Sequence, residues 1–340
     1  MALHECSKFL PVELNHNIMA RFAFRRCLQA IPLMIVVVLL VFGMLQLTPG
    51  DPVQAMVGQY PVPPEFRAAI ERHYHLNDPF LSRLWQYFAN LAHGDLGFSF
   101  QMQRPVAELI LERAPRTLLL AASGFLLGIP IGMAVGVLSA TSQNRHVDRF
   151  WTTTTLIAYA IPGFWLGQLL VIFFAMQLGW FPTQGMAPLV SRASGVGWLL
   201  ERARYLALPA ITYAIYEATR VARLMRANVI ETLGQGYIVT ARAKGLSRGA
   251  VIRRHVLRNS SLPVVTIMGY AFGVAMGGAV LIETVFSWPG VGLLLIEAIR
   301  ARDNQVVVGV VLFVCFAVIL MNLIVDLLYC ALDPRIRTGS

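Results

Sequence analysis

Charged residues are scarce in this sequence, and lysine is almost missing. Asp, Glu, Lys and Arg make up 14% of the 340 residues, and the only lysines are Lys8 and Lys244. Soluble globular domains carry about 25% charged residues. A disordered chain would carry more charge and fewer aromatic residues than the 10% present here. The composition therefore excludes a disordered chain and does not suit an ordinary soluble domain.

The sequence also lacks the motifs that mark common catalytic and metal sites. It contains no Gly-Lys-Ser/Thr to cradle a phosphate, no His-Glu-x-x-His and no Gly-x-Ser-x-Gly. His73 and His75 form an isolated pair in a polar segment, which favours solvated side chains over a metal site. The four cysteines are scattered without Cys-x-x-Cys spacing, at Cys6, Cys27, Cys315 and Cys330. We therefore exclude a P-loop ATPase and expect no catalytic residue and no metal site on this chain.

Apolar residues dominate instead, at 56% of the chain with a mean hydropathy of +0.61. A bilayer core of about 30 Å needs about 20 apolar residues in a helix. Stretches free of Asp, Glu, Lys and Arg that are long enough occur at 27–50, 117–144, 150–191, 259–282 and 304–325. The run 150–191 can hold one long helix plus an apolar loop. A sixth candidate, 205–225, is interrupted by Glu217 and Arg220. The sequence therefore predicts an all-α polytopic membrane protein with six transmembrane helices.

The first apolar run has two interpretations, a cleaved signal peptide or a membrane anchor. It is preceded by 26 residues, and no small-x-small cleavage site follows Leu47, so we expect an anchor. Translation could start at Met1 or at Met19.

Basic residues set the expected orientation. If the chain starts inside, 17 of the 28 basic residues lie in the 85 positions of the inner segments, which are 1–27, 141–149, 220–258 and 331–340. The other 11 lie in the 116 positions of the outer segments, which are 48–116, 179–205 and 285–304. Cytoplasmic ends of membrane helices collect Lys and Arg, which explains the net charge of +10 without nucleic acid. Both termini are therefore expected in the cytoplasm.

The outer segment after the first span contains two expected surface helices. One is the mixed-charge stretch 65–74, which follows three prolines, and the other is the amphipathic stretch 81–91. The second places four large apolar side chains along one side, namely Leu84, Trp85, Phe88 and Leu91. Such a helix lies on the membrane surface or caps the bundle, and we favour a packed cap without chemistry.

The cytoplasmic segment between the fourth and fifth spans has the most informative pattern. Residues 232–282 contain no Asp or Glu and carry six basic residues. A short helix over 237–244 should end at Gly245, and Ser247 should cap a second helix that ends before Pro263 opens the fifth span. Ala241 and Ala243 should let another surface approach closely. Charge alone favours a solvated loop, whereas two short capped helices favour a docking site.

Acids and glycines inside the spans leave alternatives open. Glu217, Glu283 and Asp326 lie in or beside spans, where an ionisable residue suggests a functional site. Pairing of Glu217 with Arg220 or Arg223 is the structural alternative to a proton or ion role. Glycines also repeat every four residues, at 128, 132 and 136 and at 269, 273 and 277. These stripes permit close helix packing within the chain, contact with another subunit, or the lining of a path.

Several motifs match one protein family in order and on the expected sides. They are Arg25-Arg26, Leu47-Thr-Pro-Gly-Asp-Pro52, His93-Gly-Asp-Leu-Gly-Phe-Ser99, Ile161-Pro-Gly-Phe-Trp165, the loop 237–263, Glu283-Thr-Val-Phe-Ser-Trp-Pro-Gly290 and Asp333-Pro-Arg-Ile-Arg337. From Met19 to Arg337, the sequence resembles the inner-membrane permease subunits of bacterial ABC importers of the dipeptide/oligopeptide/nickel type.

The resemblance implies a type I ABC importer permease fold and a set of functional residues. The loop around Gly245 is similar to the EAA loop, whose coupling helix docks in a cleft of the ATPase subunit, although Val239 stands where that pattern has a glutamate. The implied coupling residues are Tyr237, Thr240, Ala241, Arg242, Ala243, Lys244, Gly245 and Leu246. The implied packing or pathway residues are Gly269, Gly273, Gly277, Glu283, Trp288, Pro289 and Gly290.

The resemblance also implies the organisation of the chain in a bacterial inner membrane. It implies a cytoplasmic tail (1–26), a first transmembrane helix (27–50), a periplasmic segment with amphipathic helices (51–115), a five-helix permease core (116–331) with a coupling loop (227–261), and a cytoplasmic tail (332–340). Transport would proceed by alternating access.

The implied partners are a second homologous permease in a heterodimer, two ATPase subunits that bind ATP and Mg, a periplasmic or lipid-anchored solute-binding protein, and membrane lipid, with no nucleic acid. This chain itself would hold no cofactor and catalyse no reaction. The alternative from a different class is a self-contained secondary transporter or channel that uses Glu217 or Asp326. The substrate stays open among dipeptides, oligopeptides, glutathione, nickel chelates, opines and sugars.

Overall fold

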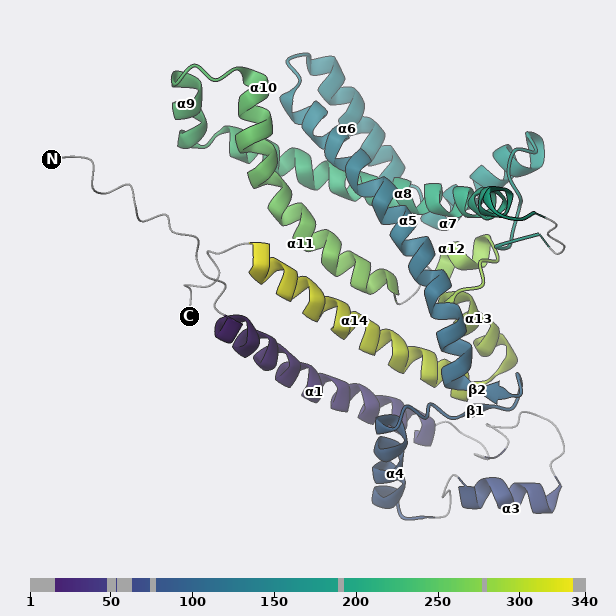
Figure 1. Ribbon diagram of the computed structural model, residues 1–340. Coiled ribbons are helices and arrows are strands. Elements are labelled where there is room, and N and C mark those ends of the chain that lie inside the picture. Colours follow the sequence, from purple (N-terminus) through teal and green to yellow (C-terminus); the bar gives the residue numbers. More distant parts are fainter. Residues whose placement is uncertain are drawn as a thin grey trace.

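The described part of the protein is a bundle of long helices with one short pair of strands (Figure 1). A computed structural model describes residues 16–47, 53, 63–73, 78–188, 193–276 and 280–332. The elements before the first long core helix are α1 (His16–Leu47), α3 (Pro64–His73), α4 (Phe80–Ala92), β1 (Phe98–Ser99) and β2 (Arg104–Pro105). The core begins with α5 (Val106–Thr141), α6 (Arg145–Ala160), α7 (Gly163–Leu170), the π-helix η1 (Val171–Gln177) and α8 (Val196–Leu233). It continues with α9 (Gly236–Ala243), α10 (Arg248–Val251), the π-helix η2 (Ile252–Val256), α11 (Leu257–Met276), α12 (Val280–Val285), α13 (Val291–Ala301) and α14 (Asn304–Leu332).

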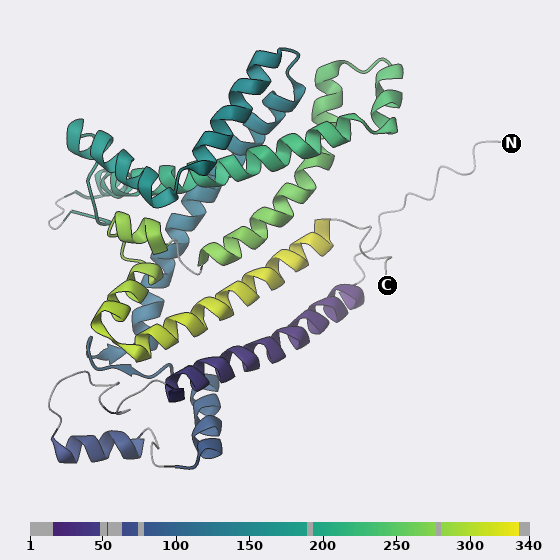
Figure 2. The ribbon, with the colours of Figure 1, turned by 180° about the vertical axis from the view of Figure 1, so that it is seen from behind.

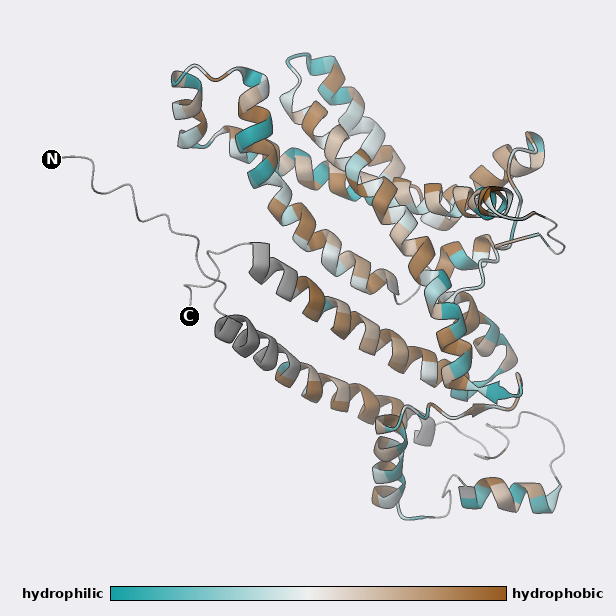
Figure 3. Cartoon of the chain, viewed as in Figure 1, coloured by the Kyte–Doolittle hydropathy of each residue, from teal (hydrophilic) through white to brown (hydrophobic). Residues whose placement is uncertain are grey.

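Hydropathy along the helices agrees with a membrane protein. The described part of α14 is almost wholly hydrophobic, whereas hydrophilic residues gather on α3, on β2 and around α10 (Figure 3). Among the described residues, α5 and α14 are long and apolar enough to cross a membrane, and α6 with α7 and η1 adds a third span if that bent pair crosses as one. In α1, the apolar stretch within the described residues is Leu28–Met44. The count of six spans remains a prediction.

Helices α5 and α8 pack against each other along much of their length, and glycine makes this possible. A Cβ atom on Gly132 would lie 2.6 Å from the carbonyl oxygen of Ala218, and one on Gly136 would lie 2.6 Å from that of Ala222. Only glycine leaves room for so close a backbone approach. The stripe 128–132–136 therefore serves packing within this chain.

Two C-terminal helices, α11 and α14, form a layer with the N-terminal α1, in the order α11, α14, α1 (Figures 1 and 2). A Cβ atom on Gly269 would lie 2.6 Å from a methyl group of Val325, and one on Gly273 would lie 3.0 Å from Cβ of Met321. These two predicted site residues therefore contact α14 of the same chain. Gly277 lies outside the described residues.

The third span is not the single long helix that the sequence predicted. Helix α6 ends at Ala160, and the helix that resumes at Gly163 and runs to Gln177 is bent by 97° from it. Pro162 explains the break, because the residue before a proline is pushed out of the helical region. Ile161 is extended accordingly, with ψ 123°.

The fifth span also differs from the prediction. The short second helix of the loop was expected to end before Ser261, with Pro263 in the first turn of a new helix. The chain instead continues as helix from Arg248 through η2 into α11, and Pro263 lies inside α11. Packing sustains the helix here, since Ser260 beside it hydrogen-bonds Asn228 and Thr232 of α8.

The outer segment forms the two predicted surface helices, α3 and α4, while Pro61 and Tyr74 lie outside the described residues. Phe88 and Leu91 of α4 pack against α1 and α14, whereas Trp85 is 75% exposed and does not join them. The following hairpin is anchored to α14, because the Ser99 hydroxyl donates a hydrogen bond of 2.5 Å to the Asp303 carboxylate. The outer segment is therefore tied to the core at the start of α14.

Candidate functional site

The loop between α8 and α11 folds as the sequence predicted at its local signals. Helix α9 ends where Gly245 adopts a left-handed φ of +80°, and the Gly245 amide donates to the Arg242 carbonyl at 2.9 Å. The Ser247 hydroxyl accepts from the Ala250 amide at 3.4 Å and caps α10. Glycine after the last helical turn and serine before the next one make the turn between α9 and α10.

Helix α9 has one face against the chain and one face to the outside. Ile238 and Ala241 are buried, at 1% and 7% exposure. The exposed residues of the predicted coupling set are Tyr237, Thr240, Arg242, Ala243, Lys244 and Gly245, to which Val239 adds an apolar side chain at 65% exposure. Leu246 packs partly against the main core cluster. The expectation that Ala241 approaches another surface therefore needs correcting, because Ala241 is part of this chain's own core.

Hydrogen bonds fix this loop to the helices on either side of it. The Tyr237 hydroxyl accepts from the Asn259 amide at 2.8 Å, and the Ser260 hydroxyl donates to Thr232 at 2.9 Å. The Arg248 guanidinium donates to the carbonyl of Thr141 at the end of α5. Tyr237 thus connects α9 to α11, Ser260 connects α11 to α8, and Arg248 connects α10 to the end of α5.

The second predicted group, in the Glu283 to Gly290 motif, converges on the start of α5. The buried Glu283 carboxylate accepts from the Thr117 hydroxyl at 2.7 Å and from the Leu293 amide at 2.9 Å. A Cβ atom on Gly290 would lie 2.3 Å from this carboxylate. The indole of Trp288, also buried, donates to the Arg116 carbonyl at 2.9 Å, and Pro289 between them is half-buried. This arrangement joins α5, α12 and α13.

Of the remaining acids, Glu217 is buried in α8 and forms an ion pair with Arg220, with oxygen to nitrogen distances of 3.2 and 3.3 Å. The structure thus brings Glu217 to Arg220 and places Arg223 elsewhere, with its guanidinium carbon 3.7 Å from the centre of the Tyr159 ring. Asp326 lies in α14, and its side chain is outside the part that the structure describes.

Comparison with known proteins places the chain in one family. Residues 128–338 match the family described as the binding-protein-dependent transport system inner membrane component, and residues 19–121 match the N-terminal unit described for such membrane components. The chain belongs to this family. It is therefore the transmembrane permease subunit of an ABC importer, as the resemblance implied.

Two relatives cover almost the whole permease. A permease of Brucella abortus (strain 2308) named for a peptide transport system is 40% identical over 319 residues, which are 94% of this chain and 99% of that protein. The glutathione transport system permease protein GsiC of Escherichia coli (strain K12) is 36% identical over 323 residues, again 94% and 99% of the two chains.

The fold of the permease is also found in a solved structure. The MetNI methionine ABC transporter, in an inward-facing conformation, aligns with a TM-score of 0.50 and 18% identity over 66% of this chain and 96% of that one. At this identity the likeness concerns the fold, and it supports the type I importer architecture.

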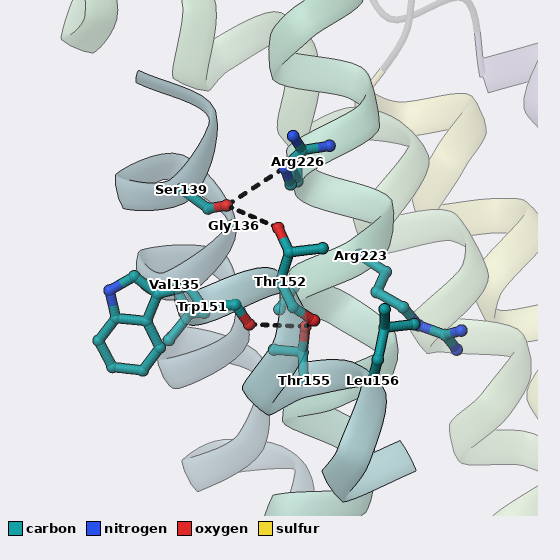
Figure 4. A pocket seen from close by; sticks show the side chains of 10 residues that line it. Val135, Gly136, Ser139, Trp151, Thr152, Thr155, Leu156, Arg223 and Arg226 are labelled. Carbon is teal, nitrogen blue, oxygen red and sulfur yellow. Dashed lines mark hydrogen bonds between the residues drawn. The ribbon is translucent and has the colours of Figure 1, made fainter. Parts of the chain in front are cut away.

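One polar cluster of the permease was not predicted. Arg226 of α8 makes two hydrogen bonds to the Asp148 carboxylate of α6, at 2.9 and 2.8 Å, and Ser139 of α5 donates to the same carboxylate at 2.5 Å. Figure 4 shows Ser139, Thr152 and Arg226 around a pocket between the three helices. Arg226 and Asp148 are 78 residues apart in the chain, so no local pattern connects them. The available signal was Ser139, a small polar residue three positions after Gly136.

Proposed function

We propose that this permease forms half of a passage for small peptides, and that ATPase subunits drive it through α9. Glutathione is itself a tripeptide, so the names of both relatives describe peptide chemistry, which supports a peptide substrate. The other half would be a second homologous permease, and a solute-binding protein would deliver the peptide from outside. ATP and Mg would be bound by two ATPase subunits in the cytoplasm, with the permease in a bacterial inner membrane.

The observation that carries this proposal is the construction of α9. Its exposed face combines the apolar side chain of Val239 with cationic Arg242 and Lys244, and residues 232–282 contain no acid. Its inner face is held by burial of Ile238 and Ala241. A helix with this exposed face, which Tyr237 bonds to α11 and which leads into α10, where Arg248 bonds to the end of α5, would transmit a push from a docked partner to the membrane helices.

The self-contained transporter, the alternative reading of the membrane acids, is not proposed. Family membership assigns the chain to an importer with separate subunits. Of the two acids on which that alternative depends, Glu217 is paired with Arg220, and the side chain of Asp326 lies outside the described part of the chain. Lys244 lies on the exposed face of α9 without the glycine-rich loop that a phosphate site requires.

The test is a carboxylate placed on the free face of α9. In Ala243→Glu, the new charge would be buried unpaired when an ATPase subunit docks, and such a charge costs about 3 to 5 kcal/mol, or a factor of hundreds in association. We expect the variant to reach the membrane in normal amount, to retain the second permease, and to lose the ATPase subunits on detergent extraction. Uptake of peptide should be lost with them.

The matched control is Gln143→Glu, which adds the same charge on the exposed turn between α5 and α6. It should keep both the ATPase subunits and uptake. Normal ATPase binding by Ala243→Glu would show that α9 is an ordinary connector. Loss of the ATPase subunits from both variants would point to a general charge effect and would equally refute docking at Ala243.

A further inference from the structure

Two arginines of α8 lie deep within the membrane-spanning part of the permease. The apolar stretch 117–144 of α5 has its middle near residue 130. At this level Gly128 of α5 contacts Glu217, and Gly132 contacts Val221 one turn further along α8. Arg220 lies between these two contacts in sequence, and Arg223 follows within one turn. Both arginines are therefore level with the central turns of a bilayer-spanning helix, and they do not belong to the predicted inner segment in which they were counted.

Lipid cannot be the neighbour of this side of α8. An arginine at the middle of a bilayer costs about 2.5 to 3.5 kcal/mol, so such residues face protein or a water-filled cavity. Arg220 is 31% exposed while its partner Glu217 is only 3% exposed, so the pair presents its cationic end outward. The outward face must therefore border a polar space or another subunit.

The positive charge of Arg223 is not neutralised by a carboxylate of the described residues. Its Nε atom is buried without a hydrogen-bond partner, and in the part of the chain that the structure describes no carboxylate forms an ion pair with it. The nearby Arg226 differs, because its charge is taken up by Asp148. Glu217, Arg220 and Arg223 together thus leave one positive charge at this depth.

The ring of Tyr159 holds the Arg223 guanidinium in position. The Arg223 guanidinium lies over the ring of Tyr159 in α6, and that ring stacks on Tyr216 of α8, with centroids 6.4 Å apart and planes 13° from parallel. Both tyrosines are partly exposed, at 43% and 38%. Residues 216, 220 and 223 share one face of the helix. Arg223 also lines the pocket of Figure 4, together with Thr152 and Thr155.

We propose that this face lines the passage and that Arg223 binds the carboxylate of the transported solute. A guanidinium pairs with a carboxylate through two parallel hydrogen bonds, and stacking on Tyr159 would hold it ready for this contact. A peptide with a free C-terminus supplies such a group. The substrate class that we assign is thus a carboxylate-bearing solute, which rests on the proposed function where that names peptides.

The experiment measures anion attraction directly, in the complete complex in lipid nanodiscs with its native cysteines replaced by serine. A reporter cysteine, Tyr216→Cys, is modified with two methanethiosulfonate reagents, one with a sulfonate and one with a quaternary ammonium group. Position 216 is seven residues, or about 10 Å, from Arg223 along the helix. Arg223→Gln should lower the anionic-to-cationic rate ratio at least about fourfold, and Arg223→Lys should preserve it.

Two further variants keep the test decisive. Leu156→Cys, which lines the same pocket from α6, replaces the reporter if Tyr216→Cys does not assemble. Arg300→Gln, an exposed arginine of α13, should leave the ratio unchanged. A ratio that does not respond to Arg223→Gln overturns the proposal. So does loss of the second permease from Arg223→Gln, because Arg223 would then pair with an acid across the permease interface. The rates need no peptide uptake, so failure of the proposed function would be seen separately.

Discussion

At the scale of single residues, Glu283 shows a buried acid whose hydrogen bonds define its role. Removing the carboxylate in Glu283→Ala would leave the Thr117 hydroxyl and the Leu293 amide without their partner in a buried site, at about 1 to 3 kcal/mol for each group. We expect a clearly lower unfolding temperature of the detergent-purified permease complex. The control, Glu108→Ala, removes an exposed acid of α5 and should change stability by less than about 1 kcal/mol. Equal unfolding temperatures would contradict the structural role of Glu283.

Local residue signals were predictable from the sequence, whereas the partner of a residue was not. Gly245 and Ser247 end and begin helices by their own backbone and side-chain chemistry, and both were predicted correctly. The burial of Ala241 was missed, since a helix of 8 residues carries too few apolar positions to reveal its inner face. The pair of Arg226 and Asp148 was missed because only the packing of α8 on α6 brings them together.

At the scale of elements, the contact of α5 with α8 predicts that replacing glycine by alanine destabilises the protein at Gly132 but not at Gly43. Alanine normally stabilises a helix by about 1 kcal/mol relative to glycine. In Gly132→Ala, however, the added Cβ would lie 2.6 Å from the Ala218 carbonyl oxygen, and a backbone atom cannot turn aside. We expect destabilisation by about 1 to 3 kcal/mol, measured as a lower unfolding temperature and less folded permease in the membrane.

Gly43 of α1 is the control for this prediction. A Cβ atom there has no neighbour within 4 Å among the described residues, so Gly43→Ala should be neutral or stabilising. Destabilisation of the same size at both positions would show that helix packing is not the reason for glycine in the 128–132–136 stripe.

Helix breaks mark the limit of prediction at this scale. Both Pro162 and Pro263 interrupt apolar runs in the sequence, yet α6 ends before the first and α11 continues through the second. The two prolines have the same intrinsic chemistry. The difference comes from tertiary contacts, since Ser260 joins the helix around Pro263 to α8. Apolar runs therefore located the helices but not their bends.

At the scale of the whole molecule, the segments predicted as inner, which are rich in Arg and Lys, and those predicted as outer lie towards different ends of the bundle. Figures 1 and 2 show α9, α10, the start of α1 and the end of α14 towards one end, with α4 and the β1–β2 hairpin at the other. The described parts of these predicted inner segments thus lie towards one end. The sidedness of that arrangement in the membrane remains a prediction that follows from the basic residues.

Single cysteines test this sidedness. Glu65 of α3 and Gln143 of the turn between α5 and α6 are both exposed, and they belong to the segments expected outside and inside. Each variant is made in a permease without its native cysteines and is tested in spheroplasts. A membrane-impermeant maleimide should label Glu65→Cys at once and Gln143→Cys only after permeabilisation. The reason is the higher density of Arg and Lys in the segments around Gln143, which resist translocation across the membrane. Labelling of Gln143→Cys in intact spheroplasts would reverse the orientation, and α9 would then face away from any cytoplasmic ATPase.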